Sequence, residues 1–158
     1  MSDVCARRPA LPARFIFEEM DVYRFSGVME AAVAAFAMMA KSSELPASSA
    51  RRKLRTVMRG EPLLAPFSHA DILDEYRQHE ANYDLDADIA GEIAIEKIEP
   101  MRGRPREVQA ILHVVRAAMP AETQVPLEQL RTLALIQLVL RAGQISRSGS
   151  GEALHPPA

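Results

Sequence analysis

Ser-Ser-Glu-Leu-Pro at residues 42–46 has a counterpart in Glu-Thr-Gln-Val-Pro at residues 122–126. Both stretches combine small or polar residues, one aliphatic residue and a proline, and each follows an apolar segment with helical spacing. Such a stretch ends one helix, and its proline suits the first position of the next helix, where no backbone N–H is needed. We therefore predict two related helix–loop–helix units, an internal two-fold repeat, around one shared core.

Apolar residues recur at spacings of three and four along most of the chain, which predicts an all-α, compact bundle of about six to seven helices. No stretch alternates with period two for long enough to form a strand. Residues 133–140 are apolar nearly all round, which is typical of a central helix surrounded by others. The predicted helices cover residues 21–40, 46–59, 68–82, 84–99, 105–119 and 126–142.

Two helix starts carry local signals. Ser68, with Asp71 three residues later, resembles a capping box and predicts the start of the third helix. Three aspartates at alternate positions suit the positive end of the fourth helix, namely Asp84, Asp86 and Asp88. A calcium-binding EF-hand would need glycine where Ile89 stands, so the helix start explains this cluster without a metal.

Length and composition place the chain among single-domain proteins. A chain of 158 residues predicts one helical domain over residues 15–143, with disordered tails at 1–14 and 144–158. The formal net charge of −2 is too small to indicate a class of partner. The one cysteine, Cys5, excludes an intramolecular disulfide. No signal peptide or membrane-spanning run is apparent, so we predict a cytoplasmic protein.

With this order of elements, the chain resembles the TerB family of tellurite-resistance proteins and the wider TerB-like helical domains, over roughly residues 20–142. The resemblance rests on three stretches: Ala-Ala-Phe-Ala-Met-Met-Ala at 34–40, Tyr-Asp-Leu-Asp at 83–86 and Val-Val-Arg-Ala-Ala-Met at 114–119. It implies an all-helical fold and a bacterial setting in tellurite or other chemical stress, often near a membrane-embedded partner. It also implies acidic clusters at both repeat positions, which the family associates with binding of divalent metals such as calcium.

The acidic clusters of the family are mostly missing here. The family has Asp-Gly where this chain has Ser-Ser at 42–43 and Glu-Thr at 122–123. Only Glu44 remains acidic at the first repeat position, and only Glu122 and Glu128 remain at the second. Because calcium takes six to eight oxygen ligands with several carboxylates among them, we predict that the metal site is lost or much weakened, and we assign no metal ligand.

Charge is segregated along the chain. The second predicted helix has a basic face, whereas residues 71–99 are acidic apart from Arg77 and Lys97. The two faces could contact each other, attract a charged partner or simply keep the domain soluble. The basic face supplies our candidate partner-binding residues, which are Arg51, Arg52, Lys53, Arg55 and Arg59. Binding of nucleic acid would usually need stacking aromatic residues, and none interleaves with these side chains.

Catalytic motifs are absent from the sequence. There is no glycine-rich phosphate loop, no nucleophile elbow and no metal-binding histidine spacing. His79 is only a neighbour of Glu80, and His113 lies among apolar residues, which predicts a partly buried structural side chain. We therefore predict that the protein is not an enzyme and that it has no cofactor.

The leading hypothesis is a non-enzymatic TerB-like helical domain that binds another protein in a stress-response or membrane-associated assembly. The first alternative is a domain that still responds to divalent metal through Glu122, Glu128 and nearby oxygens. The second alternative is a nucleic-acid-binding module that uses the basic helix at 51–59. The sequence names neither the partner nor the oligomeric state.

Overall fold

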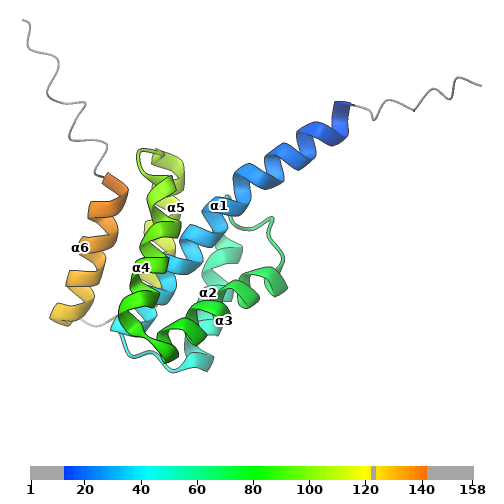
Figure 1. Ribbon diagram of the computed structural model, residues 1–158. Helices are drawn as coiled ribbons and strands as arrows, with labels where there is room; N and C mark the ends of the chain where they lie inside the picture. The colour runs from blue at the N-terminus through cyan, green and yellow to red at the C-terminus, as the bar shows by residue number, and fades with distance from the viewer. Residues whose placement is uncertain (1–12, 122–123, 142–158) are drawn as a thin grey trace, which may run out of the picture.

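The computed structural model describes the backbone of residues 13–121 and 124–141, and the side chains from Gly27 onward within these ranges. The described residues contain helices and no strand, which confirms the predicted all-α bundle. Six α-helices and one short 3₁₀ helix follow one another along the chain (Figure 1). They are α1 (Ala13–Ser42), α2 (Ala47–Gly60), α3 (His69–Leu85), α4 (Ala87–Ile98), η1 (Glu99–Met101), α5 (Pro105–Ala118) and α6 (Leu127–Arg141).

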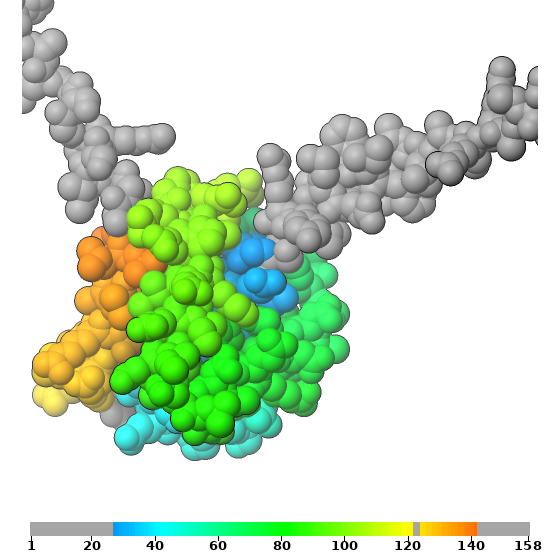
Figure 2. Space-filling model, in the orientation of Figure 1, coloured from blue at the N-terminus to red at the C-terminus, as the bar shows by residue number. Residues whose placement is uncertain are grey.

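Helix α1 is the centre of the bundle. It runs through the middle of the molecule, and α3, α4, α5 and α6 all pack against it (Figure 1). Between Val28 and Ala40 every residue except Glu30 is buried. On the face that Figure 2 shows, α1 appears as a small blue patch near its first described side chains. The largest side chain at its centre is Phe36, whose ring meets the Tyr76 ring edge to face at 5.8 Å.

Helix α6 lies on the outside, so the prediction that it is the central helix is wrong. It packs mainly on α1 and α4 and touches α5 only lightly. Ile136 and Leu140 face inward and are 1% exposed, whereas Leu138 is 62% exposed. The sequence of α6 is apolar nearly all round, yet only one side of the helix meets the protein.

Ser68 caps α3 as predicted, whereas α4 begins at Ala87 rather than at residue 84, and Asp84 lies in the last turn of α3. The hydroxyl of Ser68 accepts a hydrogen bond from the backbone N–H of Asp71, at 3.1 Å, at the start of α3. The carboxylate of Asp86 accepts from the backbone N–H groups of Asp88 and Ile89, at 3.0 and 3.1 Å, at the start of α4. Of the three aspartates, Asp86 caps α4 and satisfies N–H groups that have no partner within the helix, and Asp88 lies in its first turn.

The two proline-led stretches, 42–46 and 122–126, each separate two helices, as predicted. Each proline stands just before its helix and not inside it. Ser42 and Thr132 share a hydrogen bond between their hydroxyls, which ties the first junction to α6. At the end of α1, Glu44 adopts a left-handed φ of 51°. The Leu45 N–H then donates to the Ala40 carbonyl at 3.1 Å, and the Glu44 N–H donates to the Lys41 carbonyl. This is a Schellman motif, in which glycine usually takes the left-handed position.

Helix α1 begins at Ala13, earlier than the predicted start at Asp21, so residues 13 and 14 of the predicted N-terminal tail belong to it. The remaining predicted tail residues, 1–12 and 144–158, lie outside the described residues. None of the helices in the described ranges combines the length and the apolar character that crossing a membrane requires.

Candidate functional site

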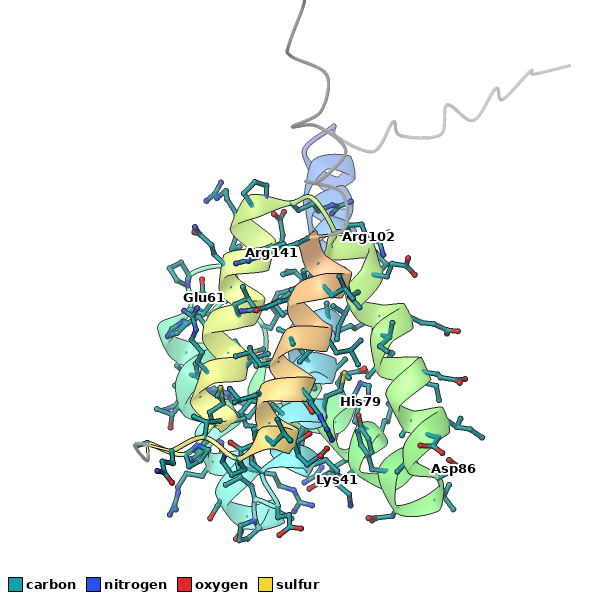
Figure 3. The ribbon with its side chains drawn as sticks, turned by 90° about the vertical axis from the view of Figure 1, so that its left-hand side faces the viewer. Lys41, Glu61, His79, Asp86, Arg102 and Arg141 are labelled. Atoms are coloured by element: carbon teal, nitrogen blue, oxygen red, sulfur yellow. The ribbon has the colours of Figure 1, made fainter. Side chains whose placement is uncertain are left out.

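The outer face of α6 carries a row of exposed leucines, which we call the α6 leucine row. Leu127 and Leu138 are 61% and 62% exposed, and Leu130 is 47% exposed. Leu135, at 39%, lies at the edge of the row. Figure 3 views the molecule from this side, with α6 in front of the bundle. Single exposed leucines are ordinary, but several on one helix face form a surface that can bind a partner.

The C-terminal end of the α6 leucine row is basic. Arg102 donates to the Val139 carbonyl at 3.0 Å, which attaches the loop before α5 to the last turn of α6. Arg102 and Arg141 therefore lie at the same end of the molecule (Figure 3). Arg104 and Arg141 border a groove of about 210 Å³ between α5 and α6. Neither forms an ion pair with a described residue, so their charge is available to a partner.

The basic face predicted on α2 is partly engaged within the protein. The Arg51 guanidinium binds the Glu80 carboxylate of α3, with Nη2 and Nε at 2.6 and 3.2 Å from Oε2. Arg59 donates to Nε2 of His69 at 2.8 Å. The other candidate residues, Arg52, Lys53 and Arg55, make no ion pair with the described part of the chain. At Arg51 the basic face of α2 and the acidic segment 71–99 therefore contact each other.

A cleft of about 520 Å³ opens between the end of α1, the start of α2 and the second half of α3; we call it the junction cleft. The side chains from α3 are Tyr76, Glu80 and Tyr83, and the first junction supplies Lys41 and Glu44. No single sequence motif predicts this cleft, because its residues lie on three separate elements. Only the spacing of the three α3 residues, about one helical turn apart, could have indicated a shared face.

The two tyrosines of the junction cleft keep their hydroxyl protons over the physiological range. Burial raises the pKa of Tyr76 to about 12, with a contribution from the negative charge of Glu80. Burial also raises the pKa of Tyr83 to about 12. Tyr76 is only 4% exposed and lines the cleft together with Tyr83. Both phenols can therefore donate hydrogen bonds to a molecule in the cleft.

The prediction of a partly buried His113 is wrong, and the buried histidine is His79. His113 was predicted to be partly buried, but its side chain is 56% exposed, and its Nδ1 lies 2.9 Å from Oε2 of Glu61. His79, which the sequence analysis treated only as a neighbour of Glu80, is 1% exposed. Its Nε2 lies 3.3 Å from Oε1 of Glu75, which also binds Lys97. Desolvation, followed by the charge of Lys97, lowers the pKa of His79, while Glu75 acts in the opposite direction.

His79 gives the fold a stability that falls in acid. Because its pKa in the folded state lies below the unfolded value of about 6.5, protonation favours the unfolded chain as the pH drops below that value. We expect the melting temperature to fall between neutral pH and about pH 5.5, and His79→Gln to reduce this fall. Thermal melts across this range, with His113→Gln as the exposed control, measure the effect. Parallel pH profiles for the wild type and His79→Gln would contradict it.

Two of the three acidic residues left from the metal motif lie within the described ranges. Glu44 borders the junction cleft, Glu128 pairs with Arg131 at 2.7 Å, and Glu122 lies outside the described residues. Within the described ranges, no three acidic, histidine or cysteine side chains gather closely enough to hold a metal ion.

Comparison with known proteins adds no relative. No protein-family model, no curated protein and no solved structure matches the chain. The TerB resemblance therefore stays a prediction from the residues that carry it.

Proposed function

We propose that the protein is a non-enzymatic helical module that binds another protein through the α6 leucine row. The observation that supports this most directly is the exposure of Leu127, Leu130 and Leu138 on one face of a peripheral helix. An α-helix with an apolar stripe of its own is the natural occupant, since such helices bind apolar faces through residues spaced by three and four.

The charges beside the row favour an acidic partner helix. Arg104 and Arg141 border the groove at one end, and its floor includes Val108, Leu112 and Leu140. A carboxylate on the partner would meet these arginines while its apolar residues cover the leucines. Such charges mainly steer association and fix the orientation of the partner, whereas the buried leucines supply most of the affinity.

The biological setting of this proposal comes from the TerB resemblance alone. It places the module in a tellurite or other chemical stress-response assembly, or in an assembly at a membrane, in a bacterial cytoplasm. The proposed surface differs from the basic face of α2 that the sequence predicted, because Arg51 and Arg59 are engaged within the protein. Arg52, Lys53 and Arg55 remain a second candidate surface for a protein, or for nucleic acid.

Four baits in a pull-down from the source cells separate the two surfaces. They are the wild type, Leu130→Ser/Leu138→Ser, Leu85→Ser and Arg52→Glu/Arg55→Glu. Leu85 is 87% exposed but lies at the end of α3, so Leu85→Ser is the matched control. We expect the double leucine variant to lose the captured protein by more than about tenfold, since each leucine that a partner covers fully contributes about 1.5–3 kcal/mol of apolar burial. The captured protein is identified by mass spectrometry and its contact mapped by cross-linking.

The outcomes are distinct. Loss with Arg52→Glu/Arg55→Glu alone would place the partner on α2 and contradict the α6 surface. Equal capture by all four baits would contradict both surfaces. Because the substituted leucines are exposed, each variant should keep its helical circular dichroism and its melting temperature.

A further inference from the structure

Helix α6 is attached to the rest of the fold by a small apolar contact. Of its 15 residues only Ile136 and Leu140 bury their apolar side chains completely, and Leu133 and Val139 pack against the core in part. The α6 leucine row faces solvent, so it adds nothing to this attachment. Segments with few buried apolar contacts open at a lower free energy than the core of the same protein.

A buried polar group without a partner weakens the attachment where α6 begins. The side chain of Gln129 is 4% exposed, and its carbonyl oxygen Oε1 accepts no hydrogen bond from a described residue. One turn further on, the Thr132 hydroxyl bonds to Ser42, and the buried hydroxyl of the adjacent Ser43 likewise has no partner within the described ranges. Buried polar groups normally have partners, and one left unpaired costs stability. When α6 moves away, water reaches Gln129 and removes this cost.

The other end of α6 is held by hydrogen bonds at the surface. Nε of Arg102 donates to the Val139 carbonyl at 3.0 Å, and the N–H of Gly103 donates to the Leu140 carbonyl at 3.3 Å. Both donors belong to exposed residues, so water can replace these bonds with little change in free energy. Because α6 lies at the edge of the bundle (Figure 1), it can move outward without displacing another described helix.

The groove between α5 and α6 exists only while α6 is attached. Arg104, Val108 and Leu112 line it from the side of α5, and Leu140 and Arg141 line it from α6. Once α6 moves away, the α6 leucine row goes with it, whereas Arg104 and the floor residues of α5 stay behind. A partner that covers the row and the groove together therefore binds only the attached position.

We propose that α6 leaves and rejoins the bundle as one unit while α1 to α5 stay folded, and that this opening regulates the partner surface. The regulation rests on the proposed function, whereas the opening does not. The unpaired Gln129 sets the balance, because its hydration favours the detached position. The apparent affinity for the partner falls with the fraction of molecules in which α6 is attached.

Hydrogen exchange of the whole chain, resolved by residue with NMR, tests the opening without a partner. An isolated helix of about 15 residues is marginal in water, so the amides of α6 exchange whenever it detaches. We expect those of 131–141 to exchange at least about 100-fold faster than those of 28–40 in α1, with one shared opening free energy. Their dependence on denaturant should also be smaller, since detaching one helix exposes less surface than unfolding the domain.

The variant Gln129→Met tests the balance. It replaces the buried amide with an apolar side chain of similar length and similar helix propensity. Because the unpaired oxygen is gone, exchange in α6 should slow by roughly tenfold. Gln137→Met is the matched control, because Gln137 lies on the same helix and is partly exposed. This variant should change the exchange by no more than about twofold.

A reversible cross-link tests the regulation. Ser42→Cys/Thr132→Cys places two thiols where the hydroxyls now meet, and Cys5→Ser removes the natural cysteine. Adding Ile136→Ala to this background weakens the attachment at a side chain that faces the bundle and not the partner. In the reduced state, Ile136→Ala should lower capture of the partner by at least about threefold, and oxidation should restore it.

Three results would overturn the proposal. Equal protection of the α6 and α1 amides would mean that α6 opens only when the whole domain unfolds. Equal exchange rates in Gln129→Met and Gln137→Met would mean that Gln129 does not set the balance. Capture that oxidation fails to restore would remove the regulation. If no protein binds the α6 leucine row, the proposed function fails while hydrogen exchange still decides the opening, so the two failures are distinguishable.

Discussion

Phe36→Ala is expected to lower the free energy of unfolding by about 3–5 kcal/mol. Phe36 is fully buried at the centre of α1, where it packs edge to face on Tyr76 with ring centroids 5.8 Å apart. Truncation removes a large apolar surface and leaves a cavity that the surrounding helices fill only in part. The total stability of a domain is about 5–15 kcal/mol, so one substitution removes a large share of it.

Denaturant unfolding followed by circular dichroism measures this loss. Phe36→Leu, which keeps part of the volume, should cost clearly less than Phe36→Ala. If Phe36→Ala unfolds the chain outright, Phe36→Leu still tests the burial of this residue, through a smaller decrease in the denaturant concentration at the unfolding midpoint. A cost below about 1 kcal/mol for Phe36→Ala would contradict the central position of α1.

Two substitutions on α6, two residues apart, are expected to differ sharply. Ile136→Ala should cost about 2–5 kcal/mol, because Ile136 is 1% exposed and faces the bundle. Leu138→Ala should change stability by no more than about 0.5 kcal/mol, because that side chain is 62% exposed. The pair compares two aliphatic residues of similar size on one helix, so helix propensity contributes little to the difference.

The same denaturant experiment shows whether α6 is central, as its sequence predicted, or peripheral, as in the structure. Similar, large losses for both variants would mean that α6 is surrounded on all sides, as its sequence predicted. Small losses for both would mean that α6 is not attached to the bundle. The expected asymmetry is also the condition for the α6 leucine row to be free for a partner.

Helix ends were predicted from the sequence because their causes are local. Ser68 and Asp86 satisfy N–H groups within three residues of themselves, so the pattern needs no knowledge of the rest of the fold. The two prolines likewise act on the residue beside them, and Pro46 and Pro126 each stand just before a helix.

The order of burial among the helices was predicted incorrectly, and alanine is the reason. The sequence of α1 looks amphipathic because its other faces carry alanines such as Ala31, Ala34 and Ala35, which periodicity does not mark as strongly apolar. These small side chains let neighbouring helices approach from every side, and all three are fully buried. The larger apolar residues of α6 led to the prediction that this helix is buried on all sides, although several of them are exposed.

The sequence predicted the candidate residues of α2 but not the junction cleft. The basic residues of α2 were found, but the pairing of Arg51 with Glu80 spans two helices and could not be read from spacing. The junction cleft was missed, since Tyr76 and Lys41 meet only when α1 and α3 pack together. Residue types indicated charge, and packing alone decided which charges remain free.

The sequence by itself determined the helices, their caps and the two proline-led junctions, because hydrogen bonds and backbone geometry within a few residues produce them. Only the tertiary structure decided that α1 is central, that α6 presents leucines to solvent and that three separate elements enclose a cleft. Those features depend on which helix faces pack together, and the helices concerned are far apart in the sequence. That choice is made by the summed fit of side-chain volumes, which no local pattern contains.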